Sequence, residues 1–232
     1  MKIDLKQKLS ALLRGWVGTI LIALLIATSI KSSLADWYVV PTGSMKPNIV
    51  EGDRIFANKL AYDLKVPYTT FHLGRWGDPK RGDVVVFNSP ADSKCLVKRV
   101  IGIPGDHIAM KDNVLIINGT ALVYEPLIQK QFDTISSLQG FDYKFYRESL
   151  DGKKHPMMIM LYQRSIRSFD AVVVPEGKYF MMGDNRDNSQ DSRYFGFVDR
   201  KSILGRALAI VISLDYERNY WPRWDRFFTK LP

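Results

Sequence analysis

The sequence has few of the residues that build metal sites and disulfides, and each shortage excludes a class of protein. Its single cysteine, Cys95, cannot form an intrachain disulfide, which excludes a small secreted fold held together by several such bonds. Zinc and iron–sulfur sites made of clustered cysteines are excluded as well. The three histidines, His72, His107 and His155, lie far apart without an HExxH spacing and predict no metal site. We therefore expect no metal or other cofactor, and any catalysis should depend on other side chains.

The composition predicts a folded core rather than a disordered chain. Apolar residues make up 46% of the 232 residues and aromatic residues 12%, which excludes the disordered and collagen-like classes. Lysine and arginine number 33 against 24 aspartate and glutamate residues, so the formal net charge is +9. The length fits one large β-rich domain or two modest ones.

One apolar run near the start of the chain suggests a membrane segment. Residues 15–30 hold no charge, but at about 1.5 Å per residue they cover only about 24 Å of a hydrocarbon core of about 30 Å. Trp16 and Trp37, about 32 Å apart along a helix, fit the two interfacial aromatic belts. We therefore predict a transmembrane anchor over residues 15–36.

Basic residues before this run predict its orientation. Residues 1–14 carry four basic side chains against one acidic side chain, so the positive-inside rule places this segment in the cytoplasm and residues 37–232 outside. The alternative is a cleaved secretory signal, because Ser33-Leu34-Ala35 has the small-x-small pattern of a cleavage site. The run slightly exceeds the usual apolar length of such signals, which favours a retained anchor.

Short β-type runs separated by turn residues follow Trp37 and predict an all-β, mainly antiparallel domain. Asn118-Gly119 between two apolar runs predicts a two-residue hairpin turn. Residues 129–170 are more polar and poorer in strand signals, which indicates an inserted subdomain or a long excursion, placed around residues 110–175. The predicted strands are Arg54–Ala57, Asp83–Phe87, Cys95–Ile101, His107–Met110, Val114–Ile117, Ala121–Tyr124, Met158–Tyr162, Ala171–Val174, Tyr179–Met182 and Ile203–Ser213.

Ser44 is a candidate nucleophile in the segment 41–47, where it stands between Gly43 and Met45 with prolines on both sides. A nucleophilic serine needs an accessible hydroxyl, N–H donors for an oxyanion and a base. Neither the GxSxG pattern nor the SxxK pattern occurs in the chain. On its own this segment is also typical of an ordinary turn.

Lys98 is a candidate general base. In a strand it shares one face with Leu96 and Val100, so its amine is expected to be poorly hydrated. An ordinary lysine, with a pKa of about 10.4, is neutral in about one molecule in 2,500 at pH 7. Desolvation that lowers the pKa by about 3 units makes the neutral amine abundant. Without such burial the residue is a strand-edge lysine that reaches solvent.

A third polar segment, residues 183–196, follows an apolar run and suggests a loop held by its own hydrogen bonds. An EF-hand frame starting at Asp187 has Ser192 in place of glycine and Val198 in place of glutamate, so calcium is not predicted. Asp191 and Arg193 are expected to form an ion pair. Ser189 is a candidate to orient a neighbouring polar group.

These three segments, in this order, resemble those of bacterial type I signal peptidases (leader peptidases), which are membrane-anchored serine proteases with a Ser-Lys dyad. The resemblance extends to residues 52–56, 81–87 and 98–106. It implies that Ser44 is the nucleophile, that Lys98 is the general base, and that Ser189 hydrogen-bonds to the lysine. It also implies an oxyanion hole formed by the Ser44 N–H and the hydroxyl of Thr42, where the family usually has serine.

The same resemblance implies that Asp191 and Arg193 brace the site. It also implies a β-rich catalytic core that carries a variable, β-rich insertion. The implied activity is removal of N-terminal signal peptides from exported preproteins after small residues at −1 and −3. The implied location is the bacterial plasma membrane, with preproteins and membrane lipid as partners and no need for nucleic acid to explain the basic charge. The residues implied to line the −1 and −3 pockets are Tyr38, Val40, Met45, Leu96 and Val97.

Three other functions fit parts of the sequence. A related peptidase for one dedicated substrate, such as a conjugation pilin, would use the same dyad. A non-catalytic extracytoplasmic scaffold would be expected to have lost a catalytic residue, and none is lost. A self-cleaving Ser-Lys repressor fits poorly with an apolar N-terminal segment. Outside the motifs, Cys95 is expected to be a buried core residue, and the aromatic and basic residues at 221–228 fit either a membrane contact or a packed tail.

Overall fold

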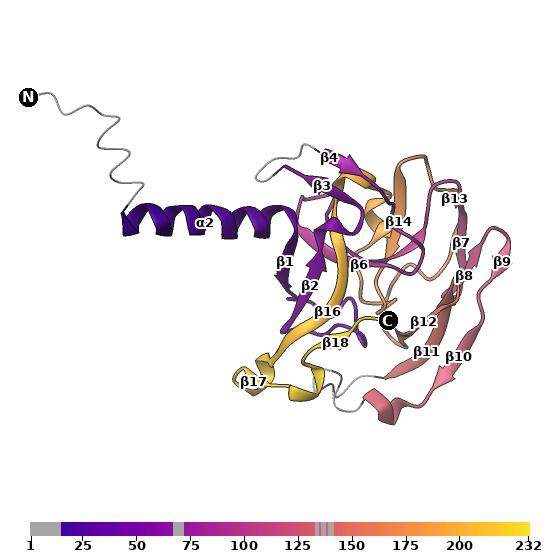
Figure 1. Ribbon diagram of the computed structural model, residues 1–232. Coiled ribbons are helices and arrows are strands. Elements are labelled where there is room, and N and C mark those ends of the chain that lie inside the picture. Colours follow the sequence, from indigo (N-terminus) through magenta and orange to yellow (C-terminus); the bar gives the residue numbers. More distant parts are fainter. Residues whose placement is uncertain (1–14, 67–71, 133–134, 136–137, 139–141) are drawn as a thin grey trace, which may run out of the picture.

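The computed structural model describes residues 15–66, 72–132, 135, 138 and 142–232. Among these residues one long helix projects from a β-rich body, as Figure 1 shows. The predicted cytoplasmic segment, residues 1–14, lies outside the described residues.

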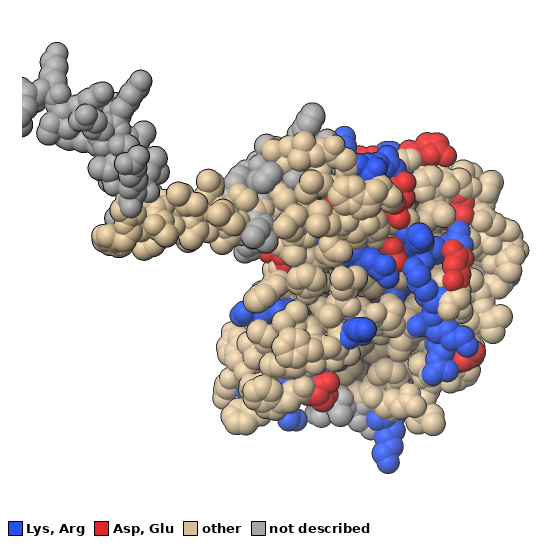
Figure 2. All heavy atoms as spheres, viewed as in Figure 1, with Lys and Arg blue, Asp and Glu red and all other residues tan. Residues whose placement is uncertain are grey.

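The projecting helix is α2 (Trp16–Ser33), and its apolar side chains are largely exposed. In Figure 2 the described side chains of this helix that are in view carry no charge, whereas lysine, arginine, aspartate and glutamate are spread over the body. In the part of the chain that the structure describes, no helix is long and apolar enough to cross a membrane. Strand β1 begins at Ala35, so the last two residues of the predicted anchor are strand rather than helix. The anchor itself stays a prediction.

The main sheet has the strand order β1-β2-β16-β5-β6-β14-β15, and two short strands, β17 and β18, also pair with β16. Every ladder in it is antiparallel. The strands are β1 (Ala35–Val39), β2 (Asp53–Asn58), β5 (Val84–Asn88), β6 (Cys95–Gly102), β14 (Lys178–Met182), β15 (Val198–Asp199), β16 (Ile203–Asp215), β17 (Trp221–Pro222) and β18 (Thr229–Lys230).

Three smaller antiparallel sheets complete the body. The first has the order β13 (Phe169–Val173), β7 (His107–Lys111), β8 (Val114–Ile117) and β9 (Thr120–Ala121). The second has the order β10 (Tyr124–Leu127), β11 (Tyr143–Leu150) and β12 (Lys153–Met160), and the third pairs β3 (Asp63–Lys65) with β4 (His72–Arg75). The short helices are α3 (Ser192–Phe195) and the 3-10 turns η1 (Lys59–Ala61), η2 (Gln129–Phe132), η4 (Arg200–Ser202), η5 (Tyr216–Arg218) and η6 (Trp224–Arg226).

The prediction of a mainly antiparallel β fold is confirmed. Val114–Ile117 has the predicted bounds, whereas the predicted strand Ala121–Tyr124 is divided between β9 and β10. Strand β11 was not predicted, because its inward residues, such as Phe145, alternate with charged outward residues such as Lys144. Lys144 and Arg147 are exposed, so the strand has a polar composition although its buried residues alternate as in a strand.

The alternation of side chains along β6 decides which face of the sheet each residue joins. Val97 lies opposite Val86 of β5, and both belong to one core cluster together with Met45. Lys98 lies opposite Val85, which belongs to a second cluster together with Val100. The predicted neighbours of Lys98 on its face are therefore confirmed.

The predicted hairpin turn at Asn118-Gly119 joins β8 to β9. Both residues have positive φ, 50° at Asn118 and 80° at Gly119, as a type I′ turn requires. We expect Gly119→Ala to lower the free energy of unfolding by about 1 kcal/mol, because alanine is strained at this φ. Gly74→Ala is the matched control, since a Cβ there meets nothing closer than 3.7 Å. Urea unfolding of both variants checks this, and an equal change in the two would contradict it.

Candidate functional site

Ser44 and Lys98 are in contact. Lys98 Nζ, from the middle of β6, lies 2.6 Å from Ser44 Oγ, in the turn between β1 and β2, and 3.1 Å from the carbonyl oxygen of Val97. Both residues are buried, with 3% of Lys98 and 8% of Ser44 exposed. The arrangement has the elements of a nucleophile hydrogen-bonded to its base.

Burial changes the chemistry of the lysine. Desolvation is the main cause that lowers the pKa of Lys98 from its ordinary value to about 8. The carboxylates of Asp191 and Asp184 act in the opposite direction, and the guanidinium of Arg193 lowers the pKa further. The neutral amine is therefore well populated near pH 8, as general base catalysis requires.

The segment 183–185 supports the serine from one side. The N–H of Asn185 donates to the carbonyl oxygen of Ser44 at 3.1 Å, and Asn185 Nδ2 donates to the carbonyl oxygen of Gly43 at 3.2 Å. Gly183 is in close contact with the same turn, because a Cβ at this position would lie 2.3 Å from the Ser44 carbonyl oxygen. Within the described residues no hydrogen bond occupies the Ser44 N–H or the Thr42 hydroxyl, and Thr42 is exposed.

A buried ion pair fixes the start of the loop 183–191. Arg99 Nε and Nη2 donate to the two carboxylate oxygens of Asp184, each at 2.8 Å, and both side chains are 1% exposed. Asn48 Nδ2 donates to the same carboxylate at 2.6 Å. Burial alone raises the pKa of Asp184, but the charge and hydrogen bonds of Arg99 hold the pKa below its ordinary value.

A second buried ion pair fixes the end of this loop. Arg193 donates through Nε and Nη2 to the two carboxylate oxygens of Asp191, each at 2.8 Å, so the predicted pair is confirmed. Asp191 also accepts from the N–H of Gly183 at 3.1 Å, and Arg193 Nη2 donates to the carbonyl oxygen of Arg186 at 2.6 Å. The loop is therefore closed on itself by charged side chains without solvent contact.

Two predictions about single residues are not met by the structure. The Ser189 hydroxyl is buried and has no hydrogen-bond partner among the described residues, so the expected bond to Lys98 is not formed. It faces Gly183, where a Cβ would lie 2.3 Å from Ser189 Oγ. Cys95 is exposed rather than buried, because it is the first residue of β6 and lies opposite Asn88, which is also exposed.

The residues expected to line the substrate pockets divide between two faces of the main sheet. Four of them pack in one core cluster: Tyr38, Val40, Met45 and Val97. Leu96 packs instead against the cluster that contains Phe87, because it alternates with Val97 along β6. Sequence reasoning gave no role to Arg99, Asp184 or Asn185, although all three lie within the motifs that it selected.

A sequence profile of the family described as "Signal peptidase, peptidase S26" matches residues 13–212. This chain belongs to the signal peptidase family. It is 37% identical to the signal peptidase I of Pseudomonas aeruginosa over 221 residues, which cover 90% of this chain and 72% of the relative. The signal peptidase I of Rickettsia akari is 34% identical over 84% of this chain and 77% of its own length. A solved signal peptidase I from Enterococcus faecalis V583 is 31% identical, with a TM-score of 0.34, over 56% of this chain and 97% of its own.

The Arg99–Asp184 pair of this signal peptidase makes a prediction about stability. We expect Arg99→Leu to lower the free energy of unfolding by about 3–5 kcal/mol, because it leaves the Asp184 carboxylate buried without its cation. Arg147→Leu is the matched control, since the pair of Arg147 with Glu125, at 3.1 Å, is exposed. Its loss should cost less than about 1 kcal/mol. Denaturant unfolding at pH 7 measures both, and equal losses would show that the burial of the pair is unimportant.

Proposed function

We propose that this protein is a signal peptidase I, a serine endopeptidase that removes N-terminal signal peptides from exported preproteins. One observation carries the proposal: Lys98 Nζ lies 2.6 Å from Ser44 Oγ in a buried environment that lowers the lysine pKa to about 8. The membership of the signal peptidase family supports the substrate class. The contact between the two residues argues against a scaffold with a decayed site.

Acylation begins when the neutral amine of Lys98 accepts the hydroxyl proton of Ser44. The serine oxygen attacks the carbonyl carbon after the −1 residue, and the negative charge on the former carbonyl oxygen is stabilised by the Ser44 N–H and the Thr42 hydroxyl. The Lys98 ammonium then protonates the leaving amine, which restores the neutral base. In deacylation the same amine takes a proton from a water molecule as the water oxygen attacks the ester carbonyl carbon. The ammonium then returns this proton to the Ser44 oxygen as it leaves, which releases the carboxylate-bearing product and restores both the free serine and the neutral base.

Substrate selection in this proposal depends on the core cluster beside the nucleophile. Val40 and Met45 lie on either side of Ser44 in the sequence and pack together with Val97. Walls formed by such side chains accept small residues and exclude large ones, which agrees with cleavage after small residues at −1 and −3. Tyr38 belongs to the same cluster, whereas Leu96 packs on the other face of the sheet, which is the face of Lys98.

We also propose that α2 anchors the enzyme in the plasma membrane, with residues 1–14 cytoplasmic and residues 37–232 outside. The exposed apolar side chains of α2 support this, and so does the short chain length between Ser33 and Ser44. Such a tether holds the nucleophile near the bilayer face, where signal peptides emerge from the membrane. Lipid and preproteins are the partners in this arrangement.

The dyad makes a prediction that combines activity with stability. Ser44→Ala and Lys98→Met should both abolish preprotein cleavage. Lys98→Met should also raise the free energy of unfolding at pH 7 by about 3 kcal/mol, because a pKa lowered by burial means that the fold disfavours the protonated amine. Cleavage assays in detergent and denaturant unfolding measure these effects.

Lys94→Met is the control for these variants, because the side chain of Lys94 is 76% exposed and forms its ion pair with the neighbouring Asp92. It should change neither activity nor stability. Full activity in Ser44→Ala or in Lys98→Met would refute the dyad.

The same pKa predicts how the rate depends on pH. Lys98 works as a base only when neutral, so kcat/KM should rise about tenfold per pH unit below pH 8 and level off above it. The profile is measured with a neutral peptide substrate between pH 6 and pH 10. A rate that stays constant from about pH 6 to pH 9 would exclude a lysine base with this pKa.

A further inference from the structure

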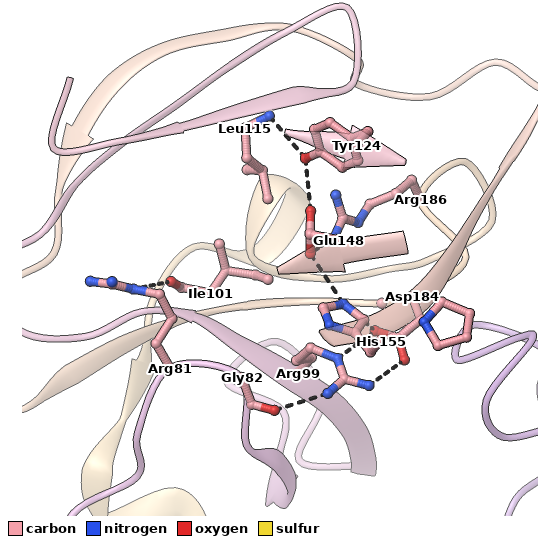
Figure 3. Close-up of polar contacts among 12 residues, drawn as sticks. Arg81, Gly82, Arg99, Ile101, Leu115, Tyr124, Glu148, His155, Asp184 and Arg186 are labelled. Carbon is pink, nitrogen blue, oxygen red and sulfur yellow. Dashed lines mark hydrogen bonds and ion pairs between the residues drawn. The ribbon is translucent and has the colours of Figure 1, made fainter. Parts of the chain in front are cut away.

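A buried polar network lies beside the site and has no part in the proposed reaction (Figure 3). Glu148 of β11 is at its centre and is fully buried, as is Arg186 of the loop 183–191. Arg186 Nη2 donates to Glu148 Oε2 at 2.5 Å, and the Tyr124 hydroxyl of β10 donates to Glu148 Oε1 at 2.7 Å. His155 of β12 places its Nε2 3.1 Å from Glu148 Oε2 and 3.8 Å from Asp184 Oδ1.

Burying this network costs the fold free energy. Burying a carboxylate and a guanidinium costs several kcal/mol for each ion, and apolar side chains of the same size often serve equally well. Burial alone raises the pKa of Glu148, but the charge of Arg186 holds the pKa far below its ordinary value, so the carboxylate stays ionised. Removal of either partner would leave the other charge buried without its counter-ion, so each of the two residues holds the other in place.

Backbone hydrogen bonds connect β12 to the loop 183–191, and a further one connects this loop to Ser44. The N–H of Met158 in β12 donates to the carbonyl oxygen of Asp184, and the N–H of Arg186 donates to the carbonyl oxygen of Met158, each at 2.9 Å. Asn185, between these two bonds, forms a parallel bridge with Met158. The same Asn185 donates to the carbonyl oxygen of Ser44. One continuous set of bonds therefore leads from β12 to the serine.

We propose that the β10–β12 sheet positions the nucleophile, with Glu148 and Arg186 as positioning residues. Glu148 holds Arg186, Arg186 fixes the loop 183–191, and Asn185 of that loop fixes the carbonyl of Ser44. The inference rests on the proposed role of Ser44 and gives a role to strands β11 and β12, which lie in the predicted insertion.

The test compares Glu148→Gln with Glu125→Gln in the full chain, using preprotein cleavage in detergent. Glu148→Gln keeps the shape of the side chain and removes its charge, so the loop should shift slightly. We expect kcat to fall about 10- to 100-fold, because displacing a reacting group by about 1 Å costs a factor of this size. KM should change less than about twofold. Glu125 lies on β10 of the same sheet, with an exposed side chain, and its variant should behave as wild type.

A second measurement separates positioning from simple loss of structure. Arg186→Gln combined with Glu148→Gln should lower kcat no further than Arg186→Gln alone, because both residues act through one contact. Assays are run well below the unfolding midpoint of every variant. Additive losses of kcat, or losses that follow only the unfolded fraction, would overturn the proposal.

Two further variants, Ser44→Ala and Tyr124→Phe, distinguish failure of the positioning role from failure of the proposed function. If Ser44→Ala is inactive and Glu148→Gln has wild-type kcat, the positioning role fails while the dyad stands. If Ser44→Ala cleaves, the proposed function itself fails. Should Glu148→Gln not fold, Tyr124→Phe removes only the hydroxyl that bonds Glu148. It should lower kcat a few-fold at unchanged KM, and an unchanged kcat would overturn the proposal.

Discussion

Keeping a lysine amine out of water is the constraint on which the other features of the site depend. Two carboxylates, those of Asp184 and Asp191, lie near enough to Lys98 to favour its charged form. Each of them is engaged by its own arginine through two hydrogen bonds. The charge of Arg193 opposes the effect of these carboxylates on the lysine pKa, and desolvation remains the largest effect. The two ion pairs are part of the electrostatics of the base as well as of the architecture of the loop.

The sequence predicted those parts of the site that depend on local pattern. Alternation along β6 placed Lys98 on an apolar face, and the spacing of Asp191 and Arg193 indicated their ion pair. Resemblance to signal peptidases then selected Ser44 as its partner. These features depend only on residue types and on the two-residue period of a strand, so they can be predicted without knowledge of the tertiary fold.

Other features depend on which segments meet in space, and for that reason they were missed or wrong. The partner of Arg99 lies 85 residues away at Asp184, and nothing local identifies it. Cys95 is apolar in type, but it stands where β6 leaves the core. Strand β11 was not predicted because its buried residues alternate with polar residues that are exposed or half-buried. In each case the environment of the residue depends on segments that are distant in the sequence, and the residue type alone does not reveal it.

The sequence separations of the contacts around Ser44 have a consequence for chain synthesis. Lys98 is 54 residues from Ser44, and Asn185 is 142 residues from Gly43. Contacts of such separation form only after the intervening chain is available, and they are slow to close. A growing chain that has already exposed its serine therefore has no organised catalytic centre until the residues around position 190 are made. We expect the nascent protease to be latent, which spares neighbouring polypeptides, including copies of itself, until its own folding is complete.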